Sequence, residues 1–179
     1  MKRDRSKPLS AADLISRLNG DPQFVRRNQE RETRRHALEA QLREEEQPLI
    51  AELRSVGLRV DSIWELVNFK GAYPKAIPIL IRHLQLPYHP KVREGIARAL
   101  TVKEARGVAT MCIIAELRRS KSPLEAEYRW ALANALSVVG GQETCAEIEA
   151  LMRDEALKEN KSILQQALKE CSKRATPNC

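Results

Sequence analysis

The sequence predicts an all-α protein of stacked helix pairs, and two observations support that prediction. The 179 residues include only seven glycines and 4% aromatic residues, a composition that disfavours a sheet-rich fold with many tight turns. A segment in the second half of the chain also recurs at a fixed spacing, which is the sequence signature of repeat architectures. One helix pair cannot bury its apolar stripe alone, so we expect neighbouring pairs to stack.

The repeat is clearest in two segments that lie 36 residues apart. Arg93–Leu100 reads REGIARAL and Arg129–Leu136 reads RWALANAL, with the arginine, two alanines and the leucine identical. A weaker third copy ends at Ser172, as expected of a terminal repeat with one face in water. A small residue at one position of each copy lets the paired helix approach closely; the three are Gly95, Ala131 and Ala167.

Capping residues, prolines and apolar spacing place the helices in order. Asn19-Gly20 ends the first helix, and Asp21-Pro22 opens a second that we expect to end at Gln47, because Pro48 should kink or break it. An apolar stripe follows from Leu49 to Val56. The remaining helices are expected over residues 62–67, 74–84, 90–100, 107–119, 123–139, 142–154 and 160–172.

The composition and apolar pattern divide the chain into three parts. Residues 1–60 form a helical extension, residues 61–173 a repeat domain and residues 174–179 a flexible tail. From Arg26 to His36 the long helix has no apolar residue, so it cannot bury a full face there. The run Glu44-Glu45-Glu46 is interpreted as a solvated face of the same helix.

The positive net charge of the chain indicates either an acidic binding partner or a role in solubility alone. The net charge is +7, and residues 61–120 are the most basic third, with 10 basic and 5 acidic side chains. Such a surplus is typical of proteins that bind nucleic acid or an acidic protein patch. The charged start MKRDRSKPLS is unlike a secretory signal, and no apolar run approaches the ~18 residues of a membrane span. We therefore expect no membrane partner and a cytoplasmic location.

The four cysteines, Cys112, Cys145, Cys171 and Cys179, include no CxxC pair. A zinc site is not expected. The even number permits disulfides, but the first three cysteines lie in apolar helical surroundings and are predicted to be reduced core residues.

No catalytic motif is present. The sequence has no phosphate-cradling glycine loop, no HExxH and no GxSxG, so we predict neither an enzyme nor a bound cofactor or metal. A Cys112–His83 pair is the one nucleophilic arrangement left open, although Cys112 within MCIIAEL is typical of a core position.

The stretch IPILIRHLQLPYHPKVREGIARAL resembles a HEAT repeat, including the proline that opens the second helix and the arginine within it. The resemblance implies a right-handed α-solenoid of about three helix pairs over residues 74–172, following an N-terminal helical extension. The whole chain is similar to small bacterial HEAT-repeat proteins, some of which act as adaptors and some as immunity proteins beside toxins. Their fold is informative, but function has to be argued from the site.

Solenoids of this kind bind partners on the concave surface lined by the second helices. Positions opposite the apolar stripe, carried along by the 36-residue repeat, form three ridges: Lys91, Glu94 and Arg98; Glu127, Trp130 and Asn134; Ile163, Gln166 and Glu170. The eight of these residues other than Ile163 are the predicted partner-binding residues. On an exposed ridge Trp130 is a candidate hot spot or stacking platform, and the alternative is packing between repeats beside Tyr128. For Lys91 and Arg98 the alternative is a solvated surface role.

Two further patterns have structural interpretations. Arg93 and Arg129 occupy equal repeat positions and are expected to tie neighbouring loops or helix ends together. Trp64, Phe69, Tyr73 and Tyr88 lie among basic residues, which is compatible with nucleic-acid binding but more typical of a core between the extension and the first repeat.

The functional hypothesis is a non-catalytic module that clamps a partner protein, such as a toxin domain, on its concave face. The main alternative is a HEAT-like protein that binds DNA or RNA, including one that repairs alkylated bases. A third hypothesis is a lyase or chaperone subunit related to bilin-attaching HEAT proteins, but the sequence shows no residues dedicated to that role.

Overall fold

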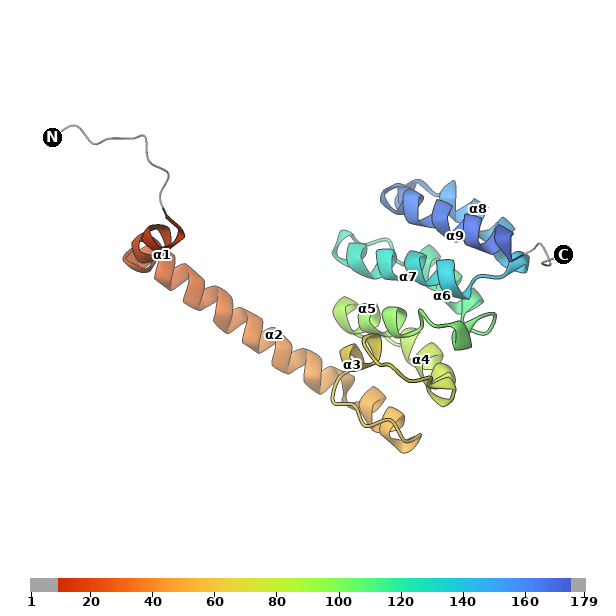
Figure 1. Ribbon diagram of the computed structural model, residues 1–179, viewed down its shortest axis with the longest axis horizontal. Coiled ribbons are helices and arrows are strands. Elements are labelled where there is room, and N and C mark those ends of the chain that lie inside the picture. The colour runs from red at the N-terminus through yellow and green to blue at the C-terminus, as the bar shows by residue number, and fades with distance from the viewer. Residues whose placement is uncertain (1–9, 175–179) are drawn as a thin grey trace. The chain divides into compact units, whose positions relative to one another are not determined.

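Figure 1 shows a computed structural model of the chain, which describes residues 10–174 apart from the side chain of Asp13. The regular secondary structure among these residues is all helical, with no strand. The α-helices are α1 (Ala11–Asn19), α2 (Pro22–Ser55), α3 (Ile63–Val67), α4 (Ile77–Leu84), α5 (Pro90–Ala99), α6 (Thr110–Arg119), α7 (Ala126–Val139), α8 (Cys145–Met152) and α9 (Lys161–Lys173). Short 3-10 segments precede α4, α6, α7, α8 and α9: η1 (Pro74–Ala76), η2 (Lys103–Ala105), η3 (Pro123–Glu125), η4 (Gln142–Thr144) and η5 (Glu155–Asn160).

The chain forms two compact units that divide between Gln41 and Leu42, inside the predicted N-terminal extension. Most of the tail expected over 174–179, the basic residues before Ser10 and Cys179 lie outside the described residues.

The first unit consists of α1 and the first twenty residues of α2. Asp21 caps α2 as predicted, because its carboxylate accepts the Gln23 N–H at 2.9 Å. Phe24, Val25 and Asn28 are partly buried, whereas every residue from Gln29 to Gln41 is exposed. This stretch of helix is exposed because it has no apolar stripe to bury.

The expected end of the second helix at Gln47 is wrong, because α2 continues through Pro48 to Ser55. Proline removes one backbone donor from a helix interior. Beyond it, Leu49, Ile50 and Leu53 are all buried, so packing of this apolar stripe outweighs the local cost of the proline.

Helices of the second unit pack in a regular succession (Figure 1). The helix α3 packs against α5, α5 against α7 and α7 against α9, while α4, α6 and α8 pack on α5, α7 and α9 in turn. One buried cluster of leucine, isoleucine and alanine side chains extends through these helices. Fully burying one leucine or isoleucine contributes about 1.5–3 kcal/mol, so packing between helices, rather than helix propensity, stabilises this unit.

Gly95 sets the distance between α5 and α3. A β-carbon at Gly95 would lie 2.7 Å from the Cγ2 atom of Ile63 and 3.4 Å from the Trp64 ring. The close approach was expected from the helix paired with α5, but the helix in contact with Gly95 is α3. Gly95 thereby brings the Trp64 ring close to α5.

Glu45 and Glu46 do not lie on a solvated face, so that interpretation of Glu44-Glu45-Glu46 is wrong for two of the three residues. Glu46 is buried, and its carboxylate accepts the Ile63 N–H at 3.1 Å and the Ser62 hydroxyl at 3.2 Å. Glu45 accepts the backbone N–H of His89 at the start of α5. Carboxylates are stabilising where helix N–H groups are unpaired, so α2 caps two other helices.

A buried ion-pair network joins α5 to α6 and α7. Glu116 of α6 is 2% exposed and receives Arg93 from α5, Arg119 from its own helix and the Tyr128 hydroxyl, the last at 3.1 Å. Arg93 also donates to Glu125 of η3 at 3.0 Å, and its guanidinium lies 4.3 Å from the centre of the Tyr128 ring. The tying role expected of Arg93 is confirmed.

Arg129 has the same role through a different acceptor. It is 6% exposed, and its guanidinium donates to the backbone carbonyl of Ser122, before η3. The expectation for this second repeat arginine is therefore confirmed as well.

Cys145 and Cys171 form a disulfide between α8 and α9, with their Cα atoms 6.1 Å apart. The prediction of reduced thiols is wrong for this pair, because α8 and α9 pack side by side and bring the two positions together. Cys112, in contrast, is half-buried and lies outside any disulfide.

We expect Gly95→Ala to destabilise the protein by about 1–2 kcal/mol. Alanine gains up to about 1 kcal/mol of helix propensity, but its β-carbon collides with Ile63, and overpacking of this kind costs about 1–3 kcal/mol. Chemical denaturation measures the change. Gly20→Ala is the matched control, because its β-carbon meets only backbone oxygens at 3.4 Å or more. Equal stability of both variants would contradict the packing argument.

Glu46→Ala and Glu46→Gln are expected to differ. Alanine leaves the buried Ile63 N–H and the partly buried Ser62 hydroxyl without this acceptor, at a cost of about 1–3 kcal/mol, whereas glutamine keeps an acceptor oxygen. Burial also raises the pKa of Glu46 above 4.5, so the folded protein holds this proton more tightly than the unfolded chain. The free energy of unfolding should therefore fall as pH rises from about 4.5 through the raised pKa, and Glu46→Gln should remove that part of the slope. Urea unfolding at a series of pH values tests both points, and identical slopes for wild type and Glu46→Gln would count against them.

Reduction of the Cys145–Cys171 disulfide should lower the melting temperature. In the chain-entropy account, a cross-link over 26 residues stabilises by roughly 3 kcal/mol. Thermal unfolding with and without reductant measures this effect in the wild type and in Cys112→Ser, which should behave alike. Cys145→Ser should melt at the lower temperature and ignore the reductant; continued sensitivity to reductant would show that another bond is responsible.

Candidate functional site

Five of the eight predicted binding residues lie together where α5 packs against α7. Lys91, Glu94 and Arg98 come from α5, and Glu127 and Trp130 from α7. Lys91 and Glu127 are separated by the 36-residue repeat, and the Lys91 Nζ atom lies 2.8 Å from a Glu127 carboxylate oxygen. The repeat spacing therefore identifies residues that meet across neighbouring helices.

Two cation–π contacts flank this cluster. The Arg98 guanidinium lies 5.2 Å from the centre of the Trp130 ring, and the Lys91 ammonium lies 5.6 Å from the Trp64 ring. Such contacts contribute about 0.5–1 kcal/mol at exposed sites. We call the set Trp64, Lys91, Glu94, Arg98, Glu127 and Trp130 the tryptophan-flanked surface.

Trp64 was missed as a member of this surface. It was assigned to the aromatic core between the extension and the first repeat, and it is in fact partly buried against that core. Because α3 approaches α5 at Gly95, the indole also reaches Lys91. The sequence signal that could have placed Trp64 here is Gly95, because a glycine within a helix permits a second helix to pack closely against it.

Glu94 is buried, 3% exposed, so its expected position on an open ridge is wrong. Its carboxylate accepts from Lys91 at 2.9 Å and from Arg98 at 2.8 Å. The reason is that α5 packs against α3 on one side and α7 on the other, so a residue opposite the core stripe is still covered. Glu94 holds the two cations in place and does not itself present a contact surface.

Trp130 is 42% exposed, which supports the surface position over packing between repeats. Tyr128, two residues earlier, is fully buried and hydrogen-bonded to Glu116. The alternation separates a structural aromatic from an accessible one on the same helix.

The hydrogen bond between Lys91 and Glu127 stabilises both side chains in their ionised forms. The hydrogen bond from Lys91 lowers the pKa of Glu127, and that same bond raises the pKa of Lys91. With Arg98 and Glu94, the surface carries two cations and two carboxylates. It is therefore nearly neutral overall while remaining strongly polar.

The other three predicted residues do not join this cluster. Asn134 is half-buried on α7, Gln166 is exposed on α9, and Glu170 pairs with Lys173 at 2.6 Å, which lowers the pKa of Glu170. Within residues 10–174, no recorded hydrogen bond or ion pair links them to Lys91, Arg98 or Trp130. Their role in binding stays a prediction.

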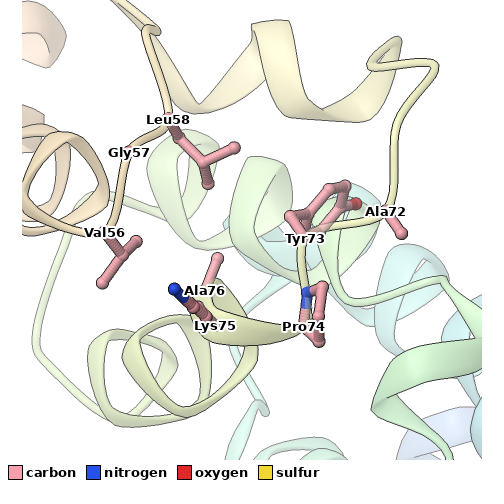
Figure 2. A pocket seen from close by; sticks show the side chains of 8 residues that line it. All are labelled: Val56, Gly57, Leu58, Ala72, Tyr73, Pro74, Lys75 and Ala76. Atoms are coloured by element: carbon pink, nitrogen blue, oxygen red, sulfur yellow. The ribbon is translucent and has the colours of Figure 1, made fainter.

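A separate hollow of about 310 Å³ lies between the turn that follows α2 and the segment that leads into α4 (Figure 2). It is lined by Val56, Gly57, Leu58, Ala72, Tyr73, Pro74, Lys75 and Ala76. The Tyr73 hydroxyl donates a hydrogen bond to the Ala99 carbonyl at 2.7 Å. Burial raises the pKa of Tyr73 to about 12. The lining is therefore mainly apolar and offers Lys75 as its charged group.

The Cys112–His83 pair that the sequence left open is not formed. The His83 Nδ1 atom lies 2.8 Å from the Tyr88 hydroxyl, and Nε2 lies 3.2 Å from a carboxylate oxygen of Glu52. Cys112 instead contacts the Gln85 amide at 3.4 Å, and burial raises the pKa of its thiol, which disfavours the reactive thiolate.

The described part of the chain contains no group of three histidine, cysteine, aspartate or glutamate side chains placed to hold a metal ion. Over the same residues, none of the helices combines the length and apolar character needed to cross a membrane. Comparison of the chain with protein-family models, with curated proteins and with solved structures gives no match.

Proposed function

We propose that residues 61–173 form a right-handed α-solenoid of HEAT-like helix pairs that binds a partner protein through the tryptophan-flanked surface. The observation that carries the proposal is the 42% exposure of Trp130 beside a preorganised set of charges. Tryptophan and arginine are the residues most enriched among interface hot spots. The succession of α3, α5, α7 and α9, each packed on the next, supports the solenoid arrangement.

The charge pattern of the surface favours a protein partner over a phosphate backbone. Its two cations are already neutralised by Glu94 and Glu127, so little unpaired positive charge is left to attract phosphates. A protein surface matches alternating charges around an aromatic anchor, and an interface of roughly 1,600 Å² is enough for stable binding. A toxin domain is the partner suggested by the resemblance to immunity proteins.

The base-repair alternative has weaker support at this surface. It requires an acidic group beside an exposed aromatic, and the charged group recorded next to Trp130 is Arg98. Asp154, the one aspartate in the repeats, instead caps η5 and pairs with Lys121 at 2.7 Å. Because Arg98 is a cation and Asp154 is already paired, the surface favours protein binding over catalysis on a nucleic-acid base.

We expect Trp130→Ala to weaken partner binding by about 30-fold or more, which corresponds to the hot-spot threshold of about 2 kcal/mol. The tagged full-length protein is first used to capture partners from native cells in the presence of nuclease, and the captured protein is then purified and titrated. Leu124→Ala is the control, because Leu124 is another exposed apolar side chain, 87% exposed on η3 and outside the surface.

The control should bind within about twofold of the wild type. Equal affinities for both variants would refute the assignment of the surface. Loss of every partner on nuclease treatment would refute protein binding itself.

A further inference from the structure

The first part of α2 carries a line of arginines that have no acidic partner among the described residues, 10–174. Arg27, Arg31 and Arg34 follow one another at spacings of four and three residues, which places them on one face of the helix. All three side chains are exposed, and together they extend about 10 Å along the helix axis. We call these three residues the arginine stripe.

Two of the three acidic residues of this helix segment pair with other arginines, and Glu32 forms no ion pair within residues 10–174. Glu30, one turn before Arg34, pairs with Arg26 at 3.5 Å, and Glu39 pairs with Arg35 at 3.7 Å. Arg31 donates to the neutral Asn28 side chain at 2.6 Å. Across residues 10–174, no ion pair is recorded for any member of the stripe.

This arrangement is unfavourable for the isolated protein. Like charges at i, i+3 and i+4 repel and destabilise a helix by a few tenths of a kcal/mol per pair. Residues 29–37 also offer no large apolar side chain with which the helix could compensate by packing. At the head of the stripe, a surface hollow of about 400 Å³ is lined by Pro22, Gln23, Arg26 and Arg27, so two guanidinium groups border one depression.

We propose that the arginine stripe binds the phosphate backbone of a nucleic-acid duplex without reading its bases. Arginine presents a planar fork that binds phosphate oxygens in a bidentate manner. A duplex carries one negative charge per about 1.7 Å of axis, so a 10 Å stripe faces about six phosphate charges. An α-helix also fits the major groove of B-form DNA, which is about 12 Å wide.

A lipid surface is a poorer match for the same helix. Helices that bind membranes carry a wide apolar face opposite their basic face. The stretch that holds the stripe lacks such a face, since residues 29–37 contain one alanine as their sole apolar residue. The proposed site lies in the first compact unit and is independent of protein binding by the second.

The test is binding of the full-length protein to a fluorescent 20-base-pair DNA duplex of mixed sequence, followed by anisotropy between 50 and 200 mM salt. Three phosphate contacts contribute a slope of about −2.7 in log K against log salt, or a roughly 40-fold loss of affinity over this range. The triple variant Arg27→Gln, Arg31→Gln, Arg34→Gln should lose that share of the slope. Glutamine is a good helix former, so circular dichroism should report unchanged helix content.

The matched control removes the same charge from the second unit. Arg59, Lys161 and Lys169 are exposed, and their combined replacement by glutamine should leave the salt slope at the wild-type value. An RNA duplex of the same sequence identifies which backbone is preferred. Trp130→Ala should bind the duplex like the wild type, which separates this test from that of partner-protein binding.

Three results would overturn the proposal. The first is no binding of the wild type at 50 mM salt. The second is an equal change of slope in the stripe variant and the charge-matched control, which would assign binding to net charge alone. The third is stripe-dependent binding to vesicles of anionic lipid that exceeds binding to both duplexes, which would make the stripe a membrane contact.

Discussion

The packing of the second unit depends on one buried carboxylate. Glu116 accepts from Arg93 of α5, Arg119 of α6 and Tyr128 of α7, so a single side chain fixes three helices relative to one another. A buried charge is tolerated only when it is paired and hydrogen-bonded, which makes this geometry demanding. Because Arg93 and Tyr128 hold α5 against α7, Lys91 can meet Glu127 and Arg98 can meet Trp130. The tryptophan-flanked surface is therefore a consequence of the network beneath it.

Electrostatics differ between the two compact units. At the tryptophan-flanked surface of the second unit, charged side chains pair across helices, as Lys91 and Glu127 do, beside an exposed indole. In the first unit, pairing stays within α2 and excludes Arg27, Arg31 and Arg34. Neutralised polar surfaces with an aromatic anchor suit protein contacts, whereas unpaired guanidinium groups suit polyanions. The division at Gln41 is thus also a division between the two kinds of binding chemistry that we propose.

Periodicity predicted what depends on local spacing and failed where distant segments meet. The 36-residue repeat located Arg93 and Arg129 and placed Lys91 and Glu127 at equivalent positions, which turn out to be in contact across α5 and α7. It could not show that Glu94 is covered, because that depends on α3 and α7 closing over both sides of α5. Glu45 caps at His89, 44 positions away, and Glu46 caps at Ile63, 17 positions away. No local sequence pattern predicts contacts over such separations. The Cys145–Cys171 bond escaped prediction for the same reason: its spacing of 26 has meaning only once α8 and α9 lie side by side.

The caps supplied by α2 also determine where the chain can be divided. A break near residue 60, where the composition changes, would separate Glu45 and Glu46 from the helix starts that they satisfy at Ile63 and His89. A break within the exposed stretch from Gln29 to Gln41 leaves those hydrogen bonds intact. A fragment of the second unit that keeps these hydrogen bonds therefore has to begin before Glu45, and we expect limited proteolysis within the exposed helix to leave them in place.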